Sequence, residues 1–314
     1  MDRAGPRPAR LIAATALVAA TGLIVAAAVR APVLRAERWL APGARFDALA
    51  TRPRECLAAA TGKQAALMAI GRTAFRTPEL LGGQAAKLRL TCASCHTNGR
   101  RNAAFAFPGL SGDPGTADVT SAVMSSHRDN GVFDPRPIPD LAFVAKVSRD
   151  PGDPALGTFV HGIVTQEFDG ADPGSVVAGG LLAYVRAIRA CIPDTREAVT
   201  LDGALADVAR AVAAAGEAVR LGDRGGARLM LGGARNALGD IDERYPRQPE
   251  ARAGLRRADA DLLRLQLALD VTVSDPAASL AAWRFPVSLL ATLRRGQARS
   301  LYDRATLARA LAAS

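Results

Sequence analysis

The sequence predicts a mainly α-helical protein with an N-terminal transmembrane helix, a helical domain that carries the chemistry, and a C-terminal helical bundle. Residues 11 to 29 are a run of 19 residues without a charge, and from about residue 201 apolar side chains recur every three or four positions. Between these regions, the stretch 97 to 157 is rich in Gly, Pro, Asp and Ser. The expected parts are 1–30 (signal anchor), 31–53 (linker), 54–195 (chemistry-bearing domain) and 196–314 (bundle domain).

The N-terminal run is long enough to cross a membrane as a helix. At about 1.5 Å per residue it would span roughly 28 Å, close to the thickness of the hydrocarbon core. Its length favours an uncleaved anchor, although the small residues at 26 to 28 would also suit cleavage of a secretory signal. Three arginines flank the run on each side, so charge does not set its orientation.

Composition restricts the class of protein and of partner. The chain has 314 residues, 49% hydrophobic and 22% charged, which is ordinary for a globular protein. A net charge of +10 suits an acidic partner or an anionic membrane surface. Aromatic residues make up only 4% of the chain and no basic cluster contains them, so we expect no nucleic-acid partner.

The chemistry-bearing domain is predicted to combine helices with a long loop. Helical patterns cover about 54 to 74, 154 to 168 and 175 to 190, and Pro193 closes the last of them. The intervening stretch, residues 97 to 157, is predicted to be a loop with short helical turns. Long loops of this kind usually wrap a ligand or cofactor.

The bundle domain is predicted to contain three to five helices and no metal or haem site. Breaks fall at 222 to 226, at 245 to 246 and at 275 to 276, and residues 201 to 314 contain neither His nor Cys. Its densest apolar segment contains Trp283 and Phe285. This segment is either a core helix or a docking patch for a partner.

The strongest functional signal is the sequence TCASCH at residues 91 to 96. Cys92, Cys95 and His96 have the C-x-x-C-H spacing of a c-type haem attachment site. Two thiols on one helical turn can each bond a haem vinyl group, and the adjoining His can bind the iron. Zinc would need further ligands at metal spacing, and a redox dithiol would be expected near a βαβ pattern. Neither is found.

Residues 76 to 192 resemble the class I cytochrome c fold. Gly83 and Leu88 precede Cys92 by nine and four residues, and LLAYVRAI at 181 to 188 is similar to the last helix of that family, with its aromatic at Tyr184. The stretches 74–96, 114–127, 130–141 and 168–188 are similar to the bacterial cytochrome c peroxidase-related family, whose members carry two such motifs where this chain has one. The resemblance implies one covalent haem c, a first helix that crosses the last at the small Gly83, and a location outside the cytoplasm.

The sequence does not identify the sixth ligand of the iron. The loop before the last helix, 168 to 175, contains neither Met nor His. The candidates are Met124, which we prefer, with His127 and His161 as alternatives, or an open iron. Three arginines that could pair haem propionates are Arg100, Arg101 and Arg136. We prefer to interpret them as ordinary surface arginines, because most exposed charges have no specific partner.

Two cysteines remain outside the motif. Cys56 and Cys191 flank the haem domain, and an oxidising compartment favours a disulfide between them, with two buried free thiols as the alternative.

The sequence therefore predicts a monohaem c-type cytochrome, anchored in the bacterial inner membrane by its N-terminal helix, that transfers electrons in the periplasm to or from a redox protein. The alternatives are a cytochrome c peroxidase-like enzyme and a haem-based sensor with an open distal position. We expect residues 201 to 314 to serve docking or assembly, separately from haem binding.

Overall fold

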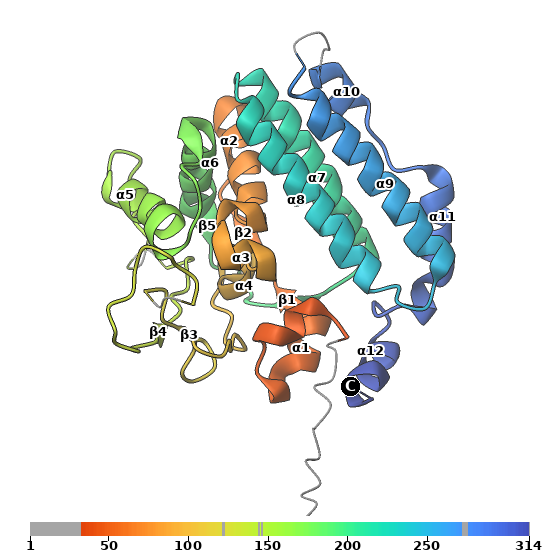
Figure 1. Cartoon of the computed structure of the whole chain (residues 1–314), viewed down its shortest axis with the longest axis horizontal. Coiled ribbons are helices and arrows are strands. Elements are labelled where there is room, and N and C mark those ends of the chain that lie inside the picture. Colours follow the sequence, from red (N-terminus) through yellow and green to blue (C-terminus); the bar gives the residue numbers. More distant parts are fainter. Residues whose placement is uncertain (1–32, 121–122, 144, 146, 272–275, 314) are drawn as a thin grey trace, which may run out of the picture. The chain divides into compact units, whose positions relative to one another are not determined.

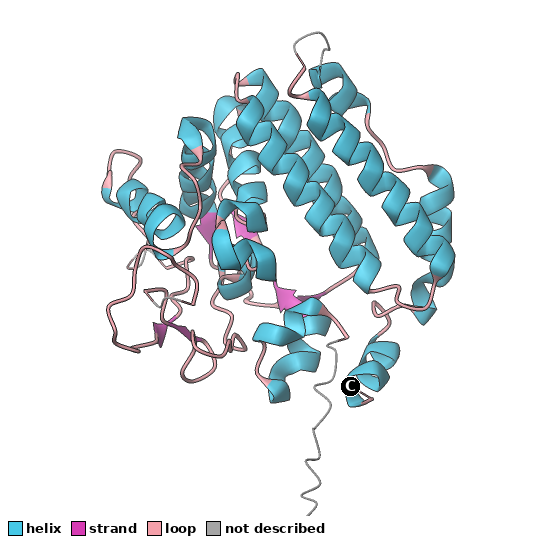
Figure 2. Cartoon of the chain, in the orientation of Figure 1, coloured by secondary structure: helices cyan, strands magenta, loops and turns pink. Residues whose placement is uncertain are grey.

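The computed structural model describes residues 33 to 313, except 121, 122, 144, 146 and 272 to 275. The described residues are mainly helical, as expected, and their strands are short two-stranded pairs (Figures 1 and 2). The predicted transmembrane helix, 11 to 29, lies outside the described residues. No helix within the described part combines the length and the apolar character that crossing a membrane requires.

The N-terminal segment was expected to be a linker from 31 to 53, but its described residues are folded. They form η1 (Arg35–Trp39), η2 (Pro42–Ala44), α1 (Arg45–Ala50) and β1 (Thr51–Pro53). Leu34 and Leu49 are buried against Leu301 and Leu307 near the C-terminal end. Of the residues that indicated a linker, Pro42 and Gly43 form η2 and Pro53 ends β1. The segment folds because its apolar side chains have a surface to cover.

The middle of the chain contains short elements around a long loop, as predicted. In chain order these are β2 (Cys56–Leu57), α2 (Gly62–Ala74), η3 (Pro78–Leu80), α3 (Gly83–Leu88), α4 (Cys92–Cys95), η4 (Thr97–Gly99), β3 (Thr116–Ala117), β4 (Arg136–Pro137), α5 (Ala155–Gly162), the π-helical turn η5 (Ile163–Glu167), α6 (Gly174–Ala187), β5 (Ile188–Arg189) and β6 (Arg196–Ala198). Strand β1 pairs with β6, β2 with β5, and β3 with β4, all antiparallel.

The helices that cross closely are α2 and α6, and the glycine at their crossing is Gly71. A Cβ on Gly71 would overlap the backbone carbonyl of Gly180. One turn further along, the rings of Phe75 and Tyr184 meet edge to face, 5.2 Å apart. The role assigned to Gly83 is therefore wrong: it begins the short helix α3 with a φ of +46° and lies against Asp169.

The C-terminal part is a helical bundle with more α-helices than the predicted three to five. In the described residues it contains α7 (Leu201–Arg220), α8 (Arg224–Glu243), α9 (Pro249–Ala268), α10 (Pro276–Ala282), α11 (Val287–Gly296), η6 (Gln297–Arg299) and α12 (Arg304–Ala312). The break at 222 to 226 is confirmed, because α8 starts at an Asp223 cap whose carboxylate accepts from the amide of Gly226. The side chains of Trp283 and Phe285 are half-buried against the core, with no helix at 283 to 286.

One hydrophobic core continues across the expected domain boundary at 195/196. Ile70 and Leu181, from α2 and α6, belong to the same buried cluster as Leu205 and Met230, from α7 and α8. Figure 1 shows α2 between α6 on one side and α7 and α8 on the other. The division into two domains stays a prediction. Because their apolar faces cover each other in this core, we expect the first part to need the bundle for stable folding.

Candidate haem-attachment site

Helix α4 presents the two motif thiols one turn apart. Cys92 is its first residue and Cys95 its last, and neither forms a disulfide. The helix begins where the Thr91 amide donates to Ser94 Oγ at 3.1 Å. Burial raises the pKa of Cys92 to about 12 and raises that of Cys95 as well. These thiols are therefore neutral at pH 7, unlike those of a redox dithiol, whose reactive thiol has a lowered pKa.

The His96 ring is held in the orientation that an iron ligand needs. Its Nδ1 lies 3.0 Å from the carbonyl oxygen of Pro139, which can only accept, so Nδ1 carries the proton and Nε2 keeps its lone pair. Burial lowers the pKa of His96 to about 4, against smaller opposing effects from the Pro139 carbonyl and Asp140. The imidazole is thus neutral at pH 7, the form that binds a metal.

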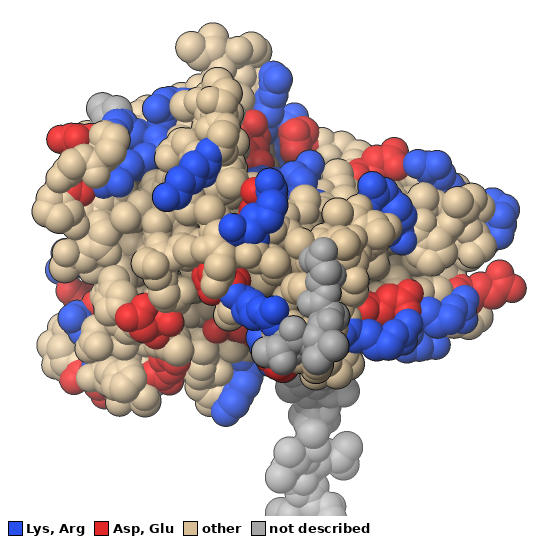
Figure 3. Space-filling view, turned by 90° about the horizontal axis from the view of Figure 1, so that it is seen from above, with Lys and Arg blue, Asp and Glu red and all other residues tan. Residues whose placement is uncertain are grey.

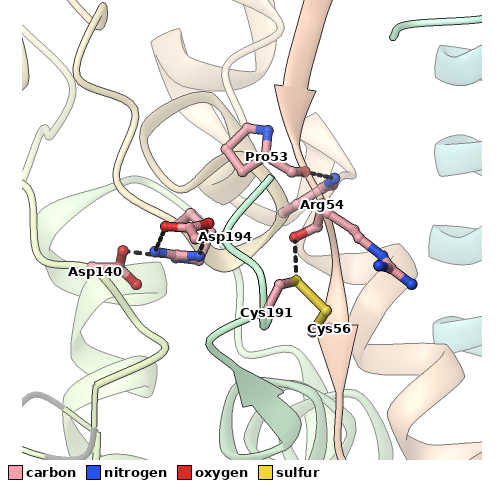
Figure 4. The surroundings of a disulfide bond; sticks show 8 residues. Pro53, Arg54, Cys56, Asp140, Cys191 and Asp194 are labelled. Carbon is pink, nitrogen blue, oxygen red and sulfur yellow. Dashed lines mark hydrogen bonds and ion pairs between the residues drawn. A yellow bond between two sulfur atoms is a disulfide. The ribbon is translucent and has the colours of Figure 1, made fainter. Parts of the chain in front are cut away.

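Arg100 holds the loop that orients His96. Its Nε donates to Asp140 Oδ2 at 2.7 Å, and its Nη1 and Nη2 donate to Asp194 at 3.0 and 3.2 Å (Figure 4). Asp140 follows Pro139 directly, so this ion pair fixes the carbonyl that His96 uses. All three guanidinium nitrogens donate to carboxylates of the chain, which favours a structural role for Arg100 over one as a propionate partner.

The other two arginines differ from Arg100 in exposure. Arg136 is 79% exposed and pairs with Asp134. Arg101 is exposed and forms no ion pair within the described residues.

Met124 lies in the same apolar cluster as the motif cysteines. Its side chain is fully buried, and Cys92 and Cys95 pack against the cluster to which it belongs. The side chains of His127 and His161 are 53% and 52% exposed, and their Nε2 atoms lie 3.9 and 3.8 Å from Asp169 and Asp172. Of the three distal candidates, only Met124 therefore shares an apolar environment with the motif thiols. The other buried members of the cluster are Trp39, Leu81, Ala85, Leu90, Phe105, Leu110, Ile138 and Phe168.

The segment that carries Met124 is tied to the π-helical turn and the residues after it. Ser125 Oγ donates to the carbonyl of Gln166 at 2.6 Å. The amide and hydroxyl of Ser126 both donate to Asp169 Oδ1, at 2.7 and 2.8 Å. Backbone position at Met124 is therefore set by neighbours about 40 residues further along the chain.

The predicted disulfide between Cys56 and Cys191 is confirmed, and it links two residues that are 135 positions apart in the sequence. It ties β2 to the segment after β5, close to the Arg100 ion pairs (Figure 4).

A buried ionic cluster next to the disulfide was not anticipated. Glu55 accepts hydrogen bonds from Arg72 Nε, Arg76 Nη2 and the Tyr184 hydroxyl, each at 2.7 Å. Burial would raise the pKa of Glu55, but the charges of Arg76 and Arg72 outweigh it and lower the pKa to about 2. Arg72 also pairs with Asp207 of α7, so the cluster joins α2 and α6 to the bundle. No local sequence pattern indicates these pairings.

A haem fits this arrangement of residues. Two thiols on one turn and a neutral His with a free Nε2 are the protein groups that a c-type haem requires. Within the described residues there is no group of three or more His, Cys, Asp or Glu side chains placed to hold a metal ion. Haem iron, whose macrocycle supplies four ligands, does not need such a group.

Comparisons with known proteins add no assignment: no protein-family model, no curated protein and no solved structure matches this chain significantly.

Proposed function

We propose that this protein is a c-type cytochrome that carries one haem on Cys92, Cys95 and His96 and transfers single electrons. The observation that carries the proposal is the hydrogen bond from His96 Nδ1 to the Pro139 carbonyl beside two unpaired thiols on one helical turn. A zinc ion would also use a His held in this way, but the described residues place no group of three or more His, Cys, Asp or Glu side chains to hold one. A reactive dithiol would need a thiol with a lowered pKa. Bound haem would supply one-electron redox chemistry.

Burial of Met124 favours electron transfer over peroxide chemistry. A thioether as sixth ligand raises the reduction potential and leaves no position for a substrate. The side chain is fully buried, and the serines that follow it are hydrogen-bonded to the 166–169 segment. This supports a closed distal side, whereas a peroxidase or a sensor would need a displaceable ligand.

The location proposed is the periplasmic face of a bacterial inner membrane, with the N-terminal run as tether and a redox protein as partner. The disulfide between Cys56 and Cys191 supports an oxidising compartment, because such bonds are rare in the cytosol. Covalent attachment of haem outside the cytoplasm agrees with that compartment.

The test of haem attachment is a haem stain after denaturing electrophoresis of the full chain, expressed with a c-type haem maturation system. We expect a stained band for the wild type and none for Cys92→Ala/Cys95→Ala. The matched control is Cys56→Ala/Cys191→Ala, which also removes two cysteines and should keep the stain. Wild-type haem that is absent, or extractable by acid and organic solvent, would refute the proposal.

The distal ligand is tested separately on the haem-loaded protein. Methionine bound to ferric haem gives a weak far-red absorption band, which we expect in the wild type and in His127→Ala but not in Met124→Ala. If the band is absent from the wild type and the spectrum is high-spin, electron transfer through a closed iron site is the wrong assignment.

A further inference from the structure

A cavity lies next to helix α4, which carries the motif cysteines. It has a volume of about 590 Å³ and is bounded by the N-terminal segment, α2, α7 and α8. Ser94 and Thr97 line it, but Cys92, Cys95 and His96 do not. The cavity is therefore separate from the candidate haem site and opens on the opposite face of α4.

This cavity is rich in arginine. Eight arginines and four acidic residues line it. Arg35 pairs with Asp240 and Glu243, and Arg52 and Arg72 share Asp207. The described part of the chain offers no ion-pair partner to four other lining arginines, namely Arg89, Arg101, Arg196 and Arg244. On the face seen in Figure 3, acidic and basic side chains are interspersed.

Arg244 is a buried cation in this wall without a carboxylate in contact. It is 9% exposed, and its Nη1 and Nη2 donate to the backbone carbonyls of Leu301 and Leu49, both at 2.8 Å. Its guanidinium carbon lies 4.9 Å from the centre of the Tyr302 ring. Burial lowers the pKa of Arg244. The carboxylate of Asp240 acts on Arg244 from a distance, but it is already ion-paired with Arg35. Buried charges are normally paired, so an anion in the cavity would add to the compensation of the Arg244 charge.

The cavity-lining side chains of Arg35 and Arg89 approach each other over Gly239 of α8, next to the lining residue Asp240. A Cβ on Gly239 would lie 3.0 Å from Arg89 Nη1 and 3.4 Å from Arg35 Nη2, so the missing side chain makes room for both guanidiniums. Arg89 donates one hydrogen bond, from Nη1 to Asn236 at 3.2 Å, and its other donors have no protein partner among the described residues. Two guanidiniums side by side, one with open donors, form a suitable site for an oxyanion.

We propose that this cavity binds a small organic anion with phosphate or carboxylate groups. The volume lies within the range of small-molecule sites. The bound anion would contact both the segment around α4 and helix α8, so its site spans the haem-bearing region and the bundle. The proposal does not depend on haem attachment, since its residues and its measurement are separate.

Isothermal titration calorimetry of the full chain at constant ionic strength tests the proposal, with inorganic phosphate and citrate as probes. We expect binding of at least one probe. Because a hydrogen bond between charged groups contributes about 1.5 to 3 kcal/mol, Arg89→Asn should weaken binding about tenfold or more. Asn suits the left-handed backbone of position 89, whose φ is +59°. Arg101→Gln provides a second, independent variant.

The matched control is Lys87→Gln, which removes an equal charge from an exposed position outside the cavity. It should bind as the wild type does. Equal affinities in Arg89→Asn, Arg101→Gln and Lys87→Gln would overturn the site, as would the absence of binding of either probe. Vesicles of phosphatidylglycerol form a third probe. Binding to the vesicles but to neither soluble probe would refute the proposal of a small organic anion and would indicate a lipid headgroup as the ligand.

Discussion

The Glu55 cluster makes stability depend on pH in a defined direction. We consider Glu55→Gln, which keeps the shape and the hydrogen-bonding oxygen but removes the negative charge between Arg72 and Arg76. The ordinary pKa is 4.5 and the folded value is about 2. The stabilisation by the charged carboxylate is thus fully present above about pH 4.5 and is lost as the pH falls towards 2.

The magnitude follows from those two pKa values. At about 1.4 kcal/mol per pKa unit, their difference corresponds to about 3 kcal/mol of folding free energy at pH 7. Integration of the same titration leaves about 1.4 kcal/mol at pH 3. The Glu55 side chain is 16% exposed, so solvent screens the interaction weakly. Loss of a buried partner leaves both arginines undercompensated, which acts in the same direction.

Urea unfolding followed by circular dichroism at pH 7, 5, 4 and 3 measures this effect. We expect Glu55→Gln to be less stable than the wild type by about 3 kcal/mol at pH 7, with the gap falling by more than half at pH 3. Glu250→Gln, at an exposed position, is the control and should differ little from the wild type. A gap below about 1 kcal/mol at pH 7, or one that does not change with pH, would refute the reasoning.

Four further changes have definite expected outcomes. Cys56→Ala/Cys191→Ala frees a long loop in the unfolded chain and should cost about 2 to 5 kcal/mol in urea unfolding; an unchanged midpoint would contradict a stabilising role of the disulfide. Gly71→Ala should destabilise the fold by about 1 to 3 kcal/mol or more, because its methyl would overlap the carbonyl of Gly180; unchanged thermal unfolding would contradict the helix crossing. Met124→Ala should cost about 2 to 5 kcal/mol in chemical unfolding even without haem, since its side chain is fully buried, and a neutral result would place it outside the core. A chain that ends before α7 should bind the apolar dye ANS and lose cooperative unfolding, because the face of α2 and α6 that α7 and α8 cover would be exposed; a cooperative melt would show that the first part folds independently.

Local pattern was enough to predict several parts of the structure. The periodicity after residue 201 predicted a helical bundle, and the glycines at 222 to 226 marked its first break. The spacing of Cys92, Cys95 and His96 placed both thiols on one helical turn. These features depend on residues close in sequence, so they are readable without knowledge of the fold.

Other features depend on contacts that the sequence does not encode locally. Pro139 orients His96 from 43 residues away, and Arg100, which the composition offered as a propionate partner, instead holds the loop next to it. The resemblance to the cytochrome c fold assigned the close helix crossing to Gly83, whereas the crossing needs a small residue where α2 meets α6, at Gly71.

The sequence by itself determined that the chain is mainly helical, where the thiols and histidine of the attachment motif lie, and which two remaining cysteines could pair. Only the tertiary structure decided that Met124 is buried in the apolar cluster against which the motif cysteines pack, while His127 and His161 face solvent. It also decided that arginines without an ion-pair partner among the described residues collect in one cavity. The physical reason is that burial and pairing depend on which distant segments cover one another. A residue's own neighbours in the chain do not specify those segments.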